Sequence, residues 1–221
     1  MAEADRQAMT PPAPPPARSA ARLTTLPNLL GLSRIAATPV VIVLLLFPFP
    51  AAGLLAFLVF GLAAATDVVD GRLARARGQV TPLGVFMDLT ADKVLVAGVL
   101  VAMVEVGLLP TWLVATLLIR ELVVQGVRQV AASADVVIAA RRLGKGKTFT
   151  TLVGMGLLLL SFDAATGGPL SRGGLHDALS FAGFWVLVLA TILSVASGWG
   201  YVSGALPLLL GDSSQGSPPP R

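Results

Sequence analysis

The feature that most constrains the fold of this chain is a series of apolar runs, each long enough to cross a lipid bilayer. About 20 residues of α-helix span the roughly 30 Å of hydrocarbon in a membrane. We identify about six such runs, over residues 28–47, 51–69, 83–104, 110–133, 147–162 and 178–201, the second continuing through Arg75 and the last towards Leu210. Backbone polar groups in hydrocarbon have to pair within their own segment, as they do in a helix. The sequence therefore predicts an all-α, polytopic membrane protein with about six transmembrane helices.

Composition supports one membrane domain between two polar tails. Of the 221 residues, 55% are hydrophobic and 13% are charged, whereas soluble domains carry about 25% charged residues. The proline-rich residues 1–22 and the polar residues 211–221 lack the apolar content that a core requires, so both tails are expected to be disordered. The transmembrane domain is expected over residues 23–210.

Composition also excludes several kinds of site. The chain has no cysteine, which rules out disulfides and thiolate metal ligands. A net charge of +4, scattered through an apolar chain, is too small to indicate nucleic-acid binding. The single histidine, His176, lies in a polar stretch and is expected in a loop, without a role as a ligand.

Four aspartates lie between residues 67 and 92, and we call them the aspartate cluster: Asp67, Asp70, Asp88 and Asp92. The first two are three residues apart and the last two four apart, so each pair shares one face of a helix. A carboxylate near hydrocarbon costs about 2.5–3.5 kcal/mol on insertion scales, and its presence there points to function. Four anions on two facing helices repel one another unless cations lie between them, and such hard oxygen ligands suit Mg²⁺ or Mn²⁺ rather than zinc.

This arrangement predicts a particular class of chemistry. Asp67, Asp70 and Asp88 are expected to supply most of a site for two divalent ions, with Asp92 shared or at its edge. Two such ions can clamp a diphosphate and stabilise a leaving phosphate, and a neighbouring carboxylate can take a proton from an attacking hydroxyl. The cluster therefore predicts phosphoryl-type transfer on a lipid diphosphate. Lys93 would point about 100° away from Asp92 and need not neutralise it. The alternative is a pair of amphipathic helix ends with solvated charges.

Small residues accompany the first two aspartates. Gly71 and Ala74 present almost no side chain beside the carboxylates, which permits close approach by a flat base, a diphosphate or a neighbouring helix. Arg75 could bind phosphate through its planar guanidinium, or could be an ordinary basic residue at the cytoplasmic face.

Basic residues lie in alternate connections between the predicted helices. One set of connections carries Arg6, Arg18, Arg22, Arg72, Arg75, Arg77, Arg141, Arg142, Lys145 and Lys147, and the opposite set carries only Arg172. Because cytoplasmic loops are enriched in Lys and Arg, both termini and the aspartate cluster are expected at the cytoplasmic face of the cell (plasma or inner) membrane.

The pattern Asp-x2-Asp-Gly-x2-Ala-Arg-x8-Gly-x3-Asp-x3-Asp resembles the signature of the CDP-alcohol phosphatidyltransferase family. It is fulfilled by Asp67, Asp70, Gly71, Ala74, Arg75, Gly84, Asp88 and Asp92. The resemblance implies a six-helix membrane enzyme, usually a homodimer, in which an alcohol displaces CMP from a CDP-linked lipid. It also implies that the first three aspartates hold metal and that Asp92 is the general base while touching the second ion. The CDP portion would contact Asp67, Gly71, Ala74, Arg75 and Gly84.

The acceptor alcohol depends on other residues, because the signature does not select it. Candidates for binding an acceptor phosphate are Arg34, Arg120, Arg128, Lys145 and Lys147. An arginine deep in a span normally faces the protein interior with a partner, so Arg120 could equally form a structural pair. Glu121, adjacent in sequence, is expected to face elsewhere and could pair with a base on another helix. Lys145 and Lys147 could equally be cytoplasmic loop charges that precede the fifth helix.

Three segments are similar to the phosphatidylglycerophosphate synthase branch of the family: Pro27-Asn28-Leu-Leu-Gly31-Leu-Ser-Arg34, Arg120-Glu121, and Gly144-Lys145-Gly-Lys147-Thr148. Two residues depart from that branch, Gly31 in place of Thr and Thr151 in place of Gln. The resemblance implies CDP-diacylglycerol and sn-glycerol 3-phosphate as substrates, and phosphatidylglycerol phosphate and CMP as products. Inositol phosphate and phosphatidylglycerol are alternative acceptors. A cation transporter is a rival from another class, but its carboxylates would be spread across the membrane depth.

Overall fold

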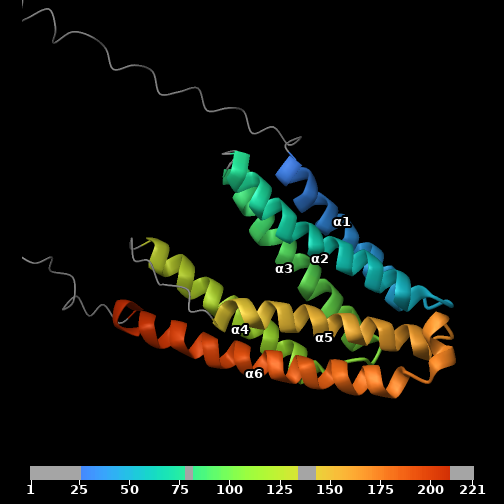
Figure 1. The fold of residues 1–221 in the computed structure, drawn as a ribbon. Helices are drawn as coiled ribbons and strands as arrows, with labels where there is room; N and C mark the ends of the chain where they lie inside the picture. The colour runs from blue at the N-terminus through green and yellow to red at the C-terminus, as the bar shows by residue number, and fades with distance from the viewer. Residues whose placement is uncertain (1–25, 78–81, 134–142, 210–221) are drawn as a thin grey trace, which may run out of the picture.

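The computed structural model describes residues 26–77, 82–133 and 143–209. In this part of the chain the structure is helical, with six α-helices and one short 3-10 helix (Figure 1). They are α1 (Leu26–Leu46), α2 (Ala52–Arg77), α3 (Pro82–Glu105), α4 (Thr111–Ser133), α5 (Leu143–Ala165), η2 (Pro169–Gly173) and α6 (His176–Leu209). The all-α prediction is confirmed. The two predicted tails lie outside the described residues.

The helices match the predicted apolar runs, but several extend beyond them. Helix α5 begins at Leu143, four residues before the predicted start at Lys147, and α2 continues to Arg77. Lys145 and Lys147 therefore lie within α5 and not in a loop that precedes it. A hydropathy criterion detects only the apolar part of a helix, whereas intrahelical hydrogen bonds continue into its polar end.

The helices form two groups that meet along part of their length. Helix α1 packs against α2 and α3, and α6 packs against α4 and α5. Contacts of α2 with α5, and fewer contacts of α3 with α4, join the two groups. In Figure 1 the groups approach each other where α2 begins and α5 ends, and they diverge towards the ends of α4 and α2.

Close helix crossings depend on glycine. A Cβ atom on Gly53 of α2 would lie 2.3 Å from the backbone nitrogen of Asp163 on α5. Gly154 of α5 and Gly183 of α6 face each other, and a Cβ atom on either would lie within 3.2 Å of the other's carbonyl oxygen. These glycines let the backbones of α2, α5 and α6 approach more closely than any other residue would permit.

A buried aspartate joins three segments at this end of the molecule. Asp163 of α5 is fully buried. Its carboxylate accepts hydrogen bonds from the backbone N–H of Leu54 in α2 and of Leu170 in η2, both at 3.1 Å. The first N–H groups of a helix have no partner within the helix, so one carboxylate satisfies the starts of two helical segments. We call this contact the Asp163 clamp.

His176 is not in a loop as predicted. It is the first residue of α6, and its ring Nδ1 lies 3.0 Å from the carbonyl oxygen of Ser161 on α5. A polar stretch does not distinguish a loop from a helix start, because the first turn of a helix is itself often polar.

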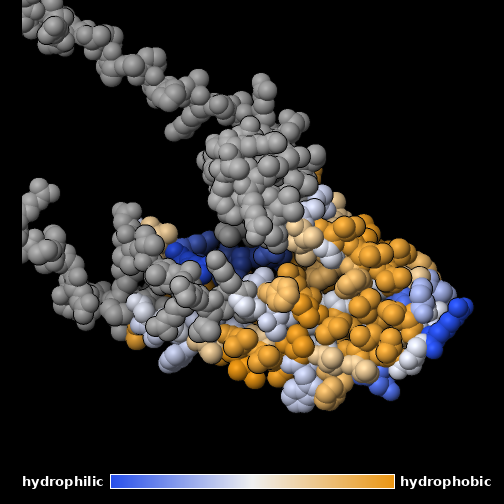
Figure 2. All heavy atoms as spheres, viewed as in Figure 1, coloured by the Kyte–Doolittle hydropathy of each residue, from blue (hydrophilic) through white to orange (hydrophobic). Residues whose placement is uncertain are grey.

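Much of the described surface on the face shown in Figure 2 is apolar. Exposed large side chains include Trp112, Ile119, Leu122, Phe181 and Trp199, each more than half exposed. Within the described residues, two helical stretches are long and apolar enough to cross a membrane, Thr148–Ala165 and His176–Gly204, and two shorter apolar stretches are Gly31–Leu46 and Ala52–Thr66. Exposed apolar surface of this extent is expected where helices face lipid.

Candidate active site

The aspartate cluster lies on two helices that follow each other in the chain. Asp67 and Asp70 are in the second half of α2, and Asp88 and Asp92 are in the first half of α3. The two helices contact each other. Helical backbone at both pairs confirms the periodicity from which the sequence analysis placed each pair on one helix face. Gly71, Ala74, Arg75 and Gly84 lie on the same two helical segments.

Of the cluster, Asp92 has a described side chain, and it lines a cavity between α3, α4, α5 and α6. The cavity has a volume of about 170 Å³. Its polar lining consists of Asp92, Lys93, Glu121, Gln125, Thr148, Thr151 and Ser194. The apolar lining consists of Val96, Ala97, Leu100, Leu117, Leu118, Leu122 and Leu152. Asp92 is half-buried, so a carboxylate stands at the edge of a largely apolar space.

The predicted metal ligands stay a prediction. Among the side chains that the structure describes, no group of three or more His, Cys, Asp or Glu residues is placed to hold a metal ion. The side chains of Asp67, Asp70 and Asp88 are outside that set. The donor chemistry of the cluster fits Mg²⁺ or Mn²⁺, because its candidate ligands are carboxylates on two contacting helices.

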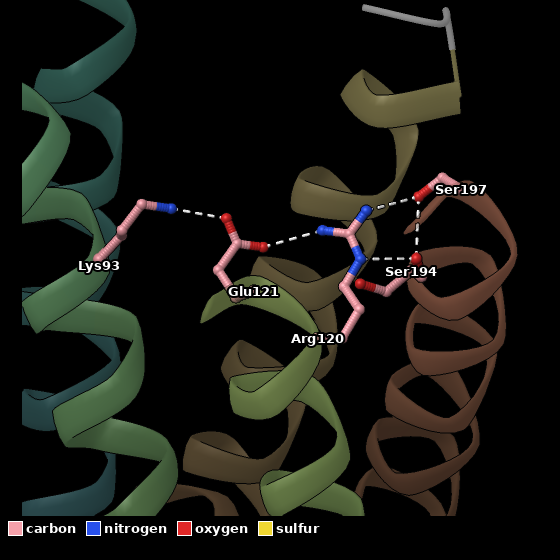
Figure 3. Close-up of polar contacts among 5 residues, drawn as sticks. All are labelled: Lys93, Arg120, Glu121, Ser194 and Ser197. Carbon is pink, nitrogen blue, oxygen red and sulfur yellow. Dashed lines mark hydrogen bonds and ion pairs between the residues drawn. The ribbon is translucent and has the colours of Figure 1, made fainter. Parts of the chain in front are cut away.

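A chain of polar contacts runs from α3 through α4 to α6 (Figure 3), and it begins at Lys93, the residue that follows Asp92 in the sequence. The Lys93 ammonium lies 2.6 Å from Glu121 Oε1. The other oxygen of Glu121, Oε2, accepts a hydrogen bond from Arg120 Nη1 at 3.0 Å. Arg120 also donates from Nε to the backbone oxygen of Ser194 and from Nη2 to the hydroxyl of Ser197, at 2.7 and 2.8 Å. We call this the Lys93–Glu121–Arg120 chain.

These contacts decide two expectations about Glu121. The prediction that it pairs with a base on another helix is confirmed, because its partner Lys93 is on α3. The expectation that it faces away from Arg120 is wrong. Neighbouring Cβ atoms on a helix do diverge by about 100°, but the arginine side chain is long enough to bring its guanidinium back to the carboxylate.

The candidate acceptor residues occupy different surroundings. Arg120 is directed at α6, with a side chain only 9% exposed. Arg34 of α1 is buried, whereas Arg128 of α4 is exposed. Lys145 and Lys147 lie in the first turns of α5, just before the cavity-lining Thr148 and Thr151. A role for any of them in binding an acceptor stays a prediction.

Three residues that form polar contacts between helices were not identified from the sequence. They are Asp163 of the Asp163 clamp, and Ser194 and Ser197, which accept hydrogen bonds from Arg120. A single carboxylate at the end of an apolar run is a recognisable signal, because such a group needs partners in a membrane protein. By contrast, serines that pair with Arg120 cannot be identified without knowing that α4 packs on α6.

Comparisons with known proteins agree with the motifs. The sequence profile of the CDP-alcohol phosphatidyltransferase family matches residues 24–196. The CDP-diacylglycerol–glycerol-3-phosphate 3-phosphatidyltransferase of Rickettsia bellii is 34% identical over 176 residues, which cover 80% of this chain and 92% of that protein. The enzyme of the same name from Bacillus subtilis is 35% identical over 190 residues, covering 80% of this chain and 93% of the relative. A cardiolipin synthase (CMP-forming) of Oryza sativa is 34% identical over 200 residues, which cover 84% of this chain but 57% of the rice protein.

The resemblance drawn from the aspartate signature is thereby confirmed over most of the chain. A match of this length argues against the cation transporter considered above, because it includes both helices of the signature. The chain belongs to the CDP-alcohol phosphatidyltransferase family and is a membrane phosphatidyltransferase of phospholipid biosynthesis.

Proposed function

We propose that this protein transfers the phosphatidyl group of CDP-diacylglycerol to sn-glycerol 3-phosphate, giving phosphatidylglycerol phosphate and CMP. The observation that carries the proposal is the position of Asp92 on the cavity that Thr148 and Thr151 of α5 also line. A carboxylate of the family signature thus shares a cavity with the helix that begins with the proposed acceptor lysines. The names of the bacterial relatives, which cover the chain at 34–35% identity, support the same reaction.

The chemistry follows from a hydroxyl next to a carboxylate. Asp92 takes the proton of the 1-hydroxyl of glycerol 3-phosphate. The resulting oxygen forms a bond to the phosphorus on the lipid side of the diphosphate, and the bond from this phosphorus to the oxygen of the CMP phosphate breaks. The proton stays on Asp92 until it passes to solvent, and CMP leaves with the electron pair of the broken bond.

Asp67, Asp70 and Asp88, with Asp92 at the edge, are the proposed ligands of two Mg²⁺ or Mn²⁺ ions. Divalent ions bound there would neutralise the diphosphate and stabilise the charge on the departing phosphate. Asp67, Gly71, Ala74, Arg75 and Gly84 are proposed to contact the CDP portion, as the family signature implies.

A phosphorylated acceptor needs cations, because its phosphate is close to a dianion. Arg34, Arg128, Lys145 and Lys147 are proposed to supply them. The guanidinium nitrogens of Arg120 donate to Ser194, Ser197 and Glu121. For Arg120 we therefore propose a structural role in joining α4 to α6 in place of binding the acceptor.

The proposed setting is the cell membrane, with both termini and the aspartate cluster at the cytoplasmic face and with two copies forming a homodimer. The orientation is supported by the basic residues of alternate connections. The apolar surface in Figure 2 supports contact with lipid.

The reaction is tested by CMP release from the purified protein with CDP-diacylglycerol and Mg²⁺ or Mn²⁺. Glycerol 3-phosphate, inositol phosphate, serine and phosphatidylglycerol are supplied separately. We expect release with glycerol 3-phosphate to exceed release with each of the others. No release with any acceptor, from protein that is folded, would contradict transferase activity, whereas release with inositol phosphate alone would change only the acceptor.

Phosphatidylglycerol is the second candidate acceptor, favoured by the similarity to a rice protein named cardiolipin synthase. The apolar lining of the cavity beside Asp92 would suit a lipid acceptor as well. The same assay separates the two acceptors, because phosphatidylglycerol would then release CMP in the absence of glycerol 3-phosphate.

Replacing Lys147 by alanine should raise the KM for glycerol 3-phosphate at least tenfold and change the KM for CDP-diacylglycerol less than threefold. A charge-assisted hydrogen bond to phosphate contributes about 1.5–3 kcal/mol, which corresponds to about 10–150-fold in affinity. Arg172→Ala is the matched control, since this exposed cation lies in η2, beyond the other end of α5. Equal effects on both KM values would remove Lys147 from the acceptor site.

A further inference from the structure

The Lys93–Glu121–Arg120 chain (Figure 3) has no part in the proposed reaction, although Lys93 and Glu121 line the same cavity as the proposed base, Asp92. Lys93 directly follows Asp92 in α3, and both residues line the cavity. Among the residues that line it, two carry carboxylates, Asp92 and Glu121. The Lys93 ammonium is held by the second of these, at 2.6 Å.

The position of this ammonium matters for any cation at the aspartate cluster. A lysine carries a compact charge on a flexible four-carbon stem, and can reach partners in several directions. A lysine ammonium at Asp92 would offset the negative charge on which binding of divalent ions depends. Glu121 on α4 lines the same cavity and offers the ammonium a different carboxylate.

Glu121 is itself well anchored. Its second oxygen accepts a hydrogen bond from Arg120. The guanidinium of Arg120 is held against α6 by hydrogen bonds to the backbone oxygen of Ser194 and the hydroxyl of Ser197. A Cβ atom on Gly198 would lie 2.9 Å from Arg120 Nε, so the guanidinium fits closely against α6. The carboxylate of Glu121 is thus held between two cations and can keep its place when one of them is removed.

We infer that Glu121 is a positioning residue that holds the Lys93 ammonium away from the aspartate cluster, so that Asp92 and its neighbours keep their affinity for divalent cations. Arg120, Ser194 and Ser197 fix Glu121 in this role. The inference rests on the metal site of the proposed function. A contact that only stabilised the packing of α3 against α4 would have a different consequence. In the role inferred here, loss of Glu121 weakens cation binding because the released Lys93 ammonium competes with the cation.

That difference makes the inference testable with a pair of variants and their combination. Glu121→Gln should raise the Mn²⁺ concentration for half-maximal CMP release about tenfold, because the released ammonium competes at the cluster. Lys93→Met should stay within threefold of the wild type, because Glu121 keeps Arg120 as its partner. The double variant Lys93→Met/Glu121→Gln should return to within threefold of the wild type, since no ammonium remains to compete.

A second measurement does not depend on turnover. Binding of Mn²⁺ to the protein without substrates is measured from the electron paramagnetic resonance signal of free Mn²⁺. The affinity of Glu121→Gln should be lower than that of the wild type, whereas Lys93→Met and the double variant should be close to the wild type. Ser197→Ala is the matched control, because it removes one acceptor of Arg120 and leaves the contact between Lys93 and Glu121 in place. Thermal unfolding of each detergent-solubilised variant verifies that it is folded.

The results separate this inference from the proposed function. Equal weakening of Mn²⁺ binding by Lys93→Met and Glu121→Gln, with no recovery in the double variant, would overturn the inference. The contact between Lys93 and Glu121 would then only stabilise the packing of α3 against α4. A wild-type protein that binds Mn²⁺ but releases no CMP would contradict the proposed reaction, and the binding measurement would still decide the role of Glu121. A wild-type protein that binds no Mn²⁺ would overturn the inference and the metal site together.

Discussion

Asp92→Asn should lower the kcat for CMP release by about 10²–10⁴-fold, the contribution that a positioned general base makes to proton transfer. Asparagine has nearly the shape of aspartate, but its amide cannot take the proton of the acceptor hydroxyl. The side chain lines the cavity next to Thr148 and Thr151 of α5, so the change should act on the reacting hydroxyl. Initial rates of CMP release at saturating concentrations of both substrates measure the effect.

The same variant also distinguishes a base from a metal ligand. If Asp92 served only to bind a divalent ion, a large excess of Mn²⁺ would restore the rate. We expect that it does not. Asp177→Asn is the control, because this aspartate is exposed in the first turn of α6. A kcat for Asp92→Asn within tenfold of the wild type would show that another group is the base.

Asp163→Ala should lower the free energy of unfolding by about 2–5 kcal/mol, which makes it the largest effect on stability that we expect. The substitution leaves the N–H groups of Leu54 and Leu170 without their acceptor in a partly buried setting, and a buried donor left unsatisfied costs about 1–3 kcal/mol. It also removes the contact between α2, α5 and η2. The midpoint of unfolding of the detergent-solubilised protein, followed by tryptophan fluorescence, measures the loss.

Asp177→Ala provides the comparison for this variant as well. Asp177 lies at the start of a helix but is exposed, so its interaction with the helix dipole contributes only about 0.3–1 kcal/mol. Similar unfolding midpoints for the two variants would mean that the Asp163 clamp does not stabilise the fold.

The helices could be predicted from the sequence because hydrocarbon permits few alternatives. Once a run of about 20 apolar residues is identified, its backbone groups have to pair internally, and the helix follows. The same criterion placed the start of α5 at Lys147 in place of Leu143, because it does not detect the polar turn that holds Lys145. Helical periodicity placed the aspartate pairs on common faces, and the backbone of α2 and α3 confirms that periodicity.

Side-chain partners between helices could be predicted only in part. A base on another helix was expected for Glu121, but its identity as Lys93 depends on the way α3 packs against α4. The serine partners of Arg120 have no signature, because isolated serines are common in membrane helices and their neighbours are set by packing. The cavity beside Asp92 is likewise a product of four helices and has no pattern in any one of them.

The Asp163 clamp lies at one end of α2 and α5, while Asp67 and Asp70 of α2 and the proposed acceptor lysines of α5 lie towards the other end of these two helices. Helices α2 and α5 are therefore held together at Leu54, which is the pivot for any change in the angle between them. Asp67 is about 20 Å along α2 from this pivot, at 1.5 Å per residue. A tilt of about 5° between α2 and α5 would move Asp67 by about 2 Å, the length of a metal–oxygen bond. Geometry at the proposed reacting end is thus sensitive to packing around Asp163, at the distant end of the same helices.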